Sequence, residues 1–189
     1  MSRAYRVRVK ESSNRTIRAE DRVSTELEMI EVLPCEQMAG LLHDELQRRG
    51  FKEEDGQMVR NQKGVTIAID PESATVSVTA EASQDVALES EKTGSAYDDA
   101  GPNSKQVEAG LRKEAQKEID RKTEQKTSEL QTKVTDRLER ELGDLRRELD
   151  EIVNRVTAEA LKRKAASMGS IKEMTEDPEA GSLTIVVEV

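Results

Sequence analysis

Two side chains in this sequence could act as a nucleophile or bind a metal, and each is the only one of its type. His43 is the single histidine and Cys35 the single cysteine. A cysteine nucleophile needs a base beside it, and a zinc site needs several cysteine or histidine ligands at suitable spacing. We therefore interpret His43 as a surface or boundary residue of a helix and Cys35 as an ordinary thiol at a helix start. We expect no metal site.

The common sequence motifs of catalytic sites are missing from the chain. It contains no G-x-G-x-x-G, G-x-x-x-x-G-K-[ST] or G-x-S-x-G motif, so nucleotide binding and serine-hydrolase chemistry have no support. Scattered acids such as Asp44, Glu45 and Asp70 are the remaining candidates for a hydrolase or transferase. Because no base, metal cluster or phosphate loop accompanies them, we expect no enzyme, no catalytic residue and no cofactor.

A basic N-terminal segment is the candidate surface for nucleic acid. Residues 1–22 carry seven basic side chains against three acidic ones, and Arg6, Arg8 and Lys10 would share one face of a strand. Such a face could contact phosphates. The whole chain, however, has a net charge of −9, with one Phe, two Tyr and no Trp to stack on bases. We therefore favour a solvated face that pairs with acidic strands, and nucleic-acid binding is the alternative.

Alternating apolar and polar residues predict a small sheet domain in residues 1–82. The clearest signal is a hairpin over residues 65–80, with Asp70 and Pro71 in its turn. Gly50 is expected to cap the preceding helix in the left-handed conformation. Further strands are expected at 5–10, 15–19, 24–33 and 58–61, with a turn at 12–14 and a helix at 35–49.

Residues 83–103 and 104–168 differ sharply in composition. The first segment is rich in Ser, Gly, Asp and Glu with little periodicity, which is typical of an acidic, flexible linker. The second contains no proline and repeats apolar residues every three or four positions, which predicts one long helix with a narrow apolar stripe. At about 1.5 Å per residue this helix would be on the order of 95 Å long. The stripe loses its apolar residues at 123–128, where any break is expected.

The C-terminal residues 169–189 return to a strand pattern. Their last strand is almost entirely aliphatic, and an isolated hairpin is marginally stable in water. We therefore expect this hairpin to complete the sheet of residues 1–82. The predicted fold class is α+β: a small, mainly antiparallel sheet with one short helix, a long charged helix resembling a coiled coil, and a C-terminal hairpin that returns to the sheet.

The apolar stripe of the long helix is the predicted partner-binding surface. A charged helix gains little from helix propensity alone, so something must cover its stripe, and a small sheet is too short to do so. Either a protein partner or a second copy of the chain would cover it, and a structural coiled-coil homo-oligomer is an alternative function. The predicted contact residues are Leu130, Val134, Leu138, Leu142, Leu145, Leu149, Ile152, Val156 and Leu161.

The expected location is the cytoplasm. No apolar run approaches the roughly 20 residues that a membrane-spanning helix needs. A single cysteine cannot form an intramolecular disulfide. We therefore expect no membrane partner.

Four segments together resemble a known group of proteins: SRAYRVRVKES, LPCEQMAGLLHDELQRRGF, GVTIAIDPESATVSVTAE and GSIKEMTEDPEAGSLTIVVEV. They are similar to accessory proteins encoded beside bacterial FtsH-type AAA ATPases in ternary systems. The resemblance covers most of the chain outside residues 83–103, and it is carried by turns and strands rather than by a catalytic motif. It implies a non-enzymatic adaptor or regulatory subunit that works with an AAA ATPase in defence or stress.

Overall fold

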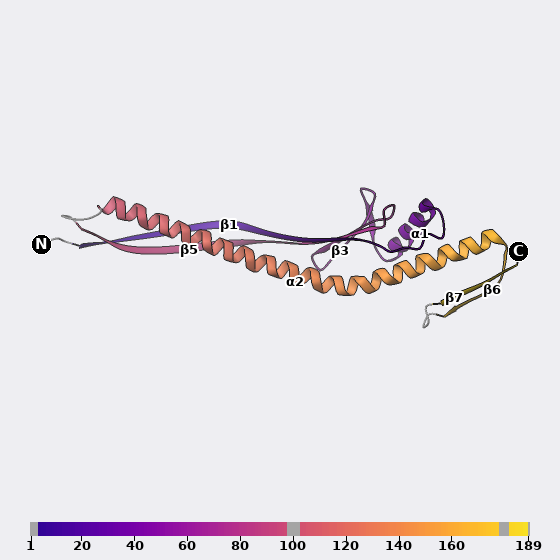
Figure 1. Cartoon of the computed structure of the whole chain (residues 1–189). Helices are drawn as coiled ribbons and strands as arrows, with labels where there is room; N and C mark the ends of the chain where they lie inside the picture. Colours follow the sequence, from indigo (N-terminus) through magenta and orange to yellow (C-terminus); the bar gives the residue numbers. More distant parts are fainter. Residues whose placement is uncertain (1–3, 98–102, 178–181, 189) are drawn as a thin grey trace. The chain divides into compact units, whose positions relative to one another are not determined.

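The computed structural model describes residues 4–97, 103–177 and 182–188 (Figure 1). Its fold is α+β, with one long helix and a C-terminal hairpin, as the sequence predicts. Neither of the helices described there is both long and apolar enough to cross a membrane. In chain order the elements are β1 (Ala4–Glu26), α1 (Cys35–Arg48), β2 (Lys52–Glu54), β3 (Gln57–Gln62), β4 (Val65–Asp70), β5 (Thr75–Tyr97), α2 (Ser104–Met168), β6 (Ser170–Asp177) and β7 (Ser182–Glu188).

Five strands form one antiparallel sheet in the order β1-β5-β4-β3-β2. The predicted hairpin is confirmed as β4–β5, with Val65 opposite Ala80. Asp70 closes its turn: the Ser73 hydroxyl donates to Oδ2 at 2.8 Å and the Glu72 N–H donates to Oδ1 at 2.9 Å. These two donors, Ser73 first, lower the pKa of Asp70 because they stabilise its charged form.

The first strand corrects the prediction of three short strands before Pro34. β1 is a single strand of 23 residues, and no turn interrupts it at residues 12–14. Odd-numbered side chains such as Val9, Ile17 and Ala19 are buried, and the even-numbered side chains between them are exposed. A short polar run does not end a strand whose alternate residues already face solvent, so Ser12, Ser13 and Asn14 continue it.

The predicted linker is wrong over residues 83–97, which belong to the strand β5. The alternation is present, but two of these three buried residues are small: Leu88, Ser90 and Ala96 are buried, and the residues between them are exposed or half-buried. Small side chains are needed because α2 approaches closely. A Cβ on Gly94 would lie only 3.2 Å from side-chain carbons of Leu111 and Val107. Residues 98–102 of the predicted linker lie outside the described residues.

The long helix α2 is continuous from Ser104 to Met168, including residues 123–128, where any break would have fallen. Threonines fill the gap in its apolar stripe. The Thr123 hydroxyl donates to the Ile119 carbonyl at 2.8 Å and the Thr127 hydroxyl to the Thr123 carbonyl at 2.9 Å. Because these hydroxyls bond to the helix itself, the half-buried positions leave no polar group unsatisfied.

A reciprocal capping arrangement begins α2. Asn103 Oδ1 accepts the Gln106 N–H at 2.9 Å, and the Asn103 N–H donates to Gln106 Oε1 at 3.1 Å. Two backbone donors at the helix start are thereby satisfied, in the manner of a capping box. Asn103 is therefore the N-cap of α2.

The chain forms two compact units, each built from segments far apart in the sequence. One contains Met1–Glu20 and Glu81–Val134, and the other contains Asp21–Ala80 and Thr135–Val189. The first unit buries Val9, Ile17, Leu88, Ala96, Ala115 and Ile119. The second buries Leu42, Leu46, Phe51, Met58, Ile69, Val76, Leu138 and Ile152. Gly50 in the second unit has a φ of 84°, which is the left-handed conformation expected after α1.

The C-terminal hairpin does not complete the five-stranded sheet, which corrects the prediction for residues 169–189. Among the described residues, β6 and β7 form a separate two-stranded antiparallel sheet. Met174 lies opposite Ile185 and Ile171 opposite Val187, with a bulge between Ile171 and Glu173. The main sheet is formed by the long strands β1 and β5 together with β4, β3 and β2, and the C-terminal hairpin is not part of it.

Candidate functional site

The predicted partner-binding residues lie mostly in the interior of the two units. Seven of the nine are buried: Leu130, Val134, Leu138, Leu145, Leu149, Ile152 and Val156. Leu142 is half-buried, and Leu161 is 39% exposed. The prediction assumed a sheet too short to cover the stripe, but β1 and β5 each have 23 residues. The chain itself therefore covers most of the stripe.

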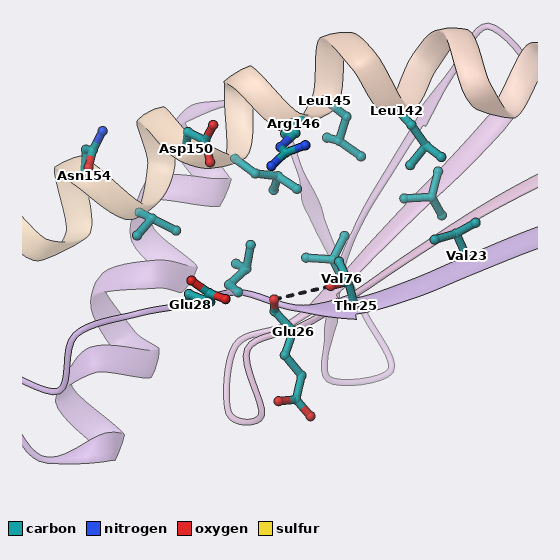
Figure 2. Close-up of a pocket in the computed structure, with 14 residues that line it drawn as sticks. Val23, Thr25, Glu26, Glu28, Val76, Leu142, Leu145, Arg146, Asp150 and Asn154 are labelled. Carbon is teal, nitrogen blue, oxygen red and sulfur yellow. Dashed lines mark hydrogen bonds between the residues drawn. The ribbon is translucent and has the colours of Figure 1, made fainter.

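An open groove lies in the second unit, where the stripe of α2 faces the end of β1. It has a volume of about 720 Å³. Figure 2 shows Leu142 and Leu145 extending from α2 toward Val23 of β1 and Val76 of β5. The β1–α2 groove is lined by Val23, Thr25, Glu26, Leu27, Glu28, Val76, Val78, Leu142, Leu145, Arg146, Leu149, Asp150, Val153 and Asn154.

The strand wall of the β1–α2 groove is also an edge of the sheet, since β1 has only β5 beside it among the described strands. The Leu27 N–H donates to the Ala74 carbonyl of the β4–β5 turn at 2.8 Å. Backbone groups in an antiparallel ladder alternate between the two sides of a strand. Those of Val23 and Thr25 therefore face β5, and those of Ser24 and Glu26 face the open edge.

Charged side chains at the mouth of the groove have no partner within the described part of the chain. Arg146, Asp150 and Glu28 line the groove, and no ion pair joins any of them to another described residue. All three are exposed. In Figure 2 the carboxylate of Glu26 points away from α2, so it is Glu28 and Asp150 that give the groove its acidic side chains.

On the opposite flank of the same helix segment, three acidic residues form ion pairs with basic residues of the sheet and of the end of α1. Arg60 of β3 binds Glu148 through two hydrogen bonds of 2.7 and 2.5 Å. Hydrogen bonding to Arg60 lowers the pKa of Glu148, although partial burial opposes the shift. Arg49 pairs with Glu151 at 3.1 Å, and Lys63 with Glu141 at 3.1 Å. These three ion pairs join α2 to α1 and the sheet on the side of the helix away from the groove.

The acids considered as catalytic candidates each have a structural partner. Glu45 is 3% exposed and binds Arg49 at 2.9 Å and Arg155 at 3.6 Å, which joins α1 to α2. Asp70 holds the β4–β5 turn. Asp44 lies 3.6 Å from His43 Nδ1. Glu45 thus has a role in packing and Asp70 a role in a turn.

The residues that could bind a metal or act as a nucleophile are His43 and Cys35, and neither belongs to a cluster of metal ligands among the described residues. His43 is half-buried, with Nε2 3.6 Å from Glu53. Cys35 is exposed, and its Sγ donates to the Glu72 carbonyl at 3.8 Å. Within the residues that the structure describes, no three His, Cys, Asp or Glu side chains converge as metal ligands.

The basic face of β1 pairs with the acidic face of β5, as the favoured interpretation of the N-terminal segment predicted. Arg8 binds Glu91 at 2.6 Å, and Lys10 binds Glu89 at 2.9 Å. These hydrogen bonds raise the pKa of both basic groups and lower the pKa of Glu91. Both pairs are exposed to solvent.

Sequence reasoning missed the groove because its two walls are far apart in the chain. The stripe positions Leu142, Leu145 and Leu149 were identified, but the polar neighbours Arg146 and Asp150 were not. The strand wall was outside the prediction altogether. A weak signal for it existed in Val23 and Thr25, which continue the odd-numbered alternation of β1 yet stay exposed at the end of the strand.

Comparison with known proteins identifies the family of the chain. A family model, that of the FtsH ternary system domain X5, matches residues 1–189. The match covers the whole chain, so the chain belongs to this family, and the resemblance found in the sequence is confirmed. No curated protein and no solved structure matches the chain.

Proposed function

We propose that this member of the FtsH ternary system domain X5 family is a non-enzymatic adaptor of the cytoplasm that binds a protein partner of its system through the β1–α2 groove. The family associates the chain with FtsH ternary systems, and this association supports a role with protein partners. The observation that carries the proposal is the groove itself: an aliphatic floor, unpaired charges at its mouth and an open strand edge as one wall.

The occupant that fits the groove is an extended segment of the partner. An extended chain can form backbone hydrogen bonds with the open edge of β1 at Ser24 and Glu26, as peptides do when they add a strand to a sheet. Its alternate side chains would then enter the groove, where Val23, Leu142 and Leu145 favour aliphatic groups. The partner buries apolar surface there, and this is the main source of affinity.

Charge complementarity predicts which charged side chains that segment carries. A carboxylate in the partner would pair with Arg146, and basic side chains would pair with Glu28 and Asp150. We infer that the partner is the FtsH-type ATPase that functions in the same system. The segment that it contributes would be aliphatic and carry charges of both signs. An adaptor of this kind needs no reactive side chain, in keeping with acids whose described partners are structural.

Direct binding to the purified FtsH-type ATPase of the same system tests the proposal. Isothermal titration calorimetry with the full chain should give saturable binding. Val23→Asp places a charge in the apolar floor, and Arg146→Glu reverses a charge at the mouth; each should weaken binding about tenfold or more. Both side chains are exposed, so the fold should tolerate the changes.

Arg147→Glu is the matched control. Arg147 is the next residue of α2, its side chain is 79% exposed, and it pairs with Asp144 rather than lining the groove. Its reversal should leave affinity unchanged. Absence of binding to the ATPase, or equal loss with Arg146→Glu and Arg147→Glu, would overturn the proposed use of the groove. Turnover of nucleotide, ester or peptide substrates that is lost on replacing Asp44 would overturn the non-enzymatic role.

A further inference from the structure

The C-terminal hairpin has two free edges of very different character. In the described part of the chain, β6 and β7 pair only with each other, so each strand has one side without backbone partners. β6 carries Lys172 and Glu173 and is bulged between Ile171 and Glu173. Charges and bulges are devices that protect an edge strand from pairing with another chain. The edge of β6 is protected in both ways.

The edge of β7 has neither protection. Between Ser182 and Glu188 the strand reads Leu183-Thr184-Ile185-Val186-Val187, with no charge and no proline. Its one charged residue, Glu188, already pairs with Lys172 at 2.8 Å. Pairing another strand here would therefore bury no uncompensated charge. Regular, uncharged edges of this kind are templates for strand addition.

The hairpin also lacks a cover for its apolar side chains. Val186 is 44% exposed, Met174 41% and Ile171 36%. These residues belong to a sheet of only two strands. A two-stranded hairpin is marginally stable, and three or more strands with an apolar face are needed for a stable sheet. A strand from another molecule added beside the hairpin would therefore stabilise it.

We propose that β7 pairs antiparallel with β7 of a second copy of this chain, which joins the two hairpins into one four-stranded sheet. The interaction is independent of the β1–α2 groove and of its proposed partner. The sequence of β7 is self-complementary about Ile185, the central residue of Ser182–Glu188. A twofold axis at Ile185 sets Leu183 opposite Val187 of the second copy and Ser182 opposite Glu188, so no like charges meet.

Residues directly opposite in an antiparallel pair lie on the same face of the sheet. The pairing therefore extends one apolar face across four strands, since Met174 and Ile171 lie opposite Ile185 and Val187 within each hairpin. Shifting the register by one residue would move this apolar set to the other face. The twofold register centred on Ile185 keeps the face continuous and also pairs β7 over its whole length, because Ile185 is the central residue of Ser182–Glu188.

The oligomeric state of the full chain over a wide concentration range tests this proposal. Light scattering should show wild type reaching twice the mass of the chain. Ile185→Lys and Ile185→Glu should each lose the dimer, because the residue meets its own copy at the axis and like charges repel. A mixture of the two variants should recover a dimer, because a Lys then faces a Glu. A misfolded hairpin could not give this recovery.

Met174→Lys is the control for a charge on the same face. Met174 lies opposite Ile185 within the hairpin but on β6, away from the proposed axis. The Met174→Lys variant should therefore still form the dimer. The proposal is overturned by a wild type that stays monomeric at every concentration. A dimer that survives Ile185→Lys, or a mixture of the Lys and Glu variants that stays monomeric, overturns it as well.

Discussion

Arg60 and Glu148 form a two-pronged ion pair, Nη1 to Oε1 at 2.7 Å and Nη2 to Oε2 at 2.5 Å, that ties strand β3 to helix α2. The guanidinium also lies over the ring of Phe51, 4.3 Å from its centroid. Both charged side chains are largely withdrawn from water, at 18% and 26% exposure. The pair joins α2 to the sheet within the second unit.

Removing Arg60 should destabilise the second unit. Arg60→Ala leaves Glu148 without its partner in a half-buried position and exposes the face of Phe51, so we expect a loss of about 2–4 kcal/mol in the free energy of unfolding. Urea denaturation followed by circular dichroism measures it. Arg147→Ala, which removes an exposed arginine with a surface partner, should cost less than about 0.5 kcal/mol. Equal effects of the two changes would contradict a special role for Arg60.

Acid should weaken the first unit through Glu118. Hydrogen bonds from Lys122 and then Lys92 lower the pKa of Glu118 from 4.5 to about 2. A lowered pKa in the folded state means that the stabilisation is present above the unfolded value, and is lost as the pH falls from 4.5 toward about 2. Thermal melts of wild type and Glu118→Gln should therefore differ near neutral pH and converge below about pH 2. A constant difference in melting temperature across this range would count against the assignment.

Two glycines should respond to substitution with opposite signs. A side chain on Gly94 would collide with Leu111 and Val107, because even its Cβ would lie 3.2 Å from their carbons. Gly94→Val should cost about 1–3 kcal/mol through overpacking. Gly110 in α2 has no atom within 4 Å of an added Cβ, so Gly110→Ala should stabilise by about 0.5–1 kcal/mol. Chemical denaturation of both variants checks the pair, and a tolerated valine at residue 94 would refute the close approach of α2.

Deleting residues 170–189 should leave the five-stranded sheet folded. The hairpin forms its own sheet and donates no strand to the other, so its loss removes no backbone ladder from it. We expect a cooperative thermal melt of the truncated chain close to that of the full chain, measured by circular dichroism. A truncated protein that aggregates or melts without cooperativity would restore the interpretation that the C-terminal strands support the main sheet.

The local periods of the sequence predicted most of the elements. The helix over residues 104–168 follows from its 3.6-residue repeat and freedom from proline, and the β4–β5 hairpin follows from strict alternation about the turn at Asp70. The helix and the hairpin each depend on residues that are near neighbours in the chain, so the amino-acid sequence is enough to predict both. Continuity at residues 123–128 could not be read from the apolar repeat, because Thr123 and Thr127 interrupt it and bond their hydroxyls to carbonyls of α2 instead.

What only the tertiary structure decided is which elements lie against each other. Residues 83–97 resemble a linker in composition, yet they form a strand whose Gly94 and Ala96 are small because α2 packs on them. That length of strand covers the stripe that the sequence left exposed. The β1–α2 groove likewise needs Val23 and Leu145, distant in the chain, to meet across an open sheet edge. Pairing between distant segments depends on packing of the whole fold, which no local period encodes.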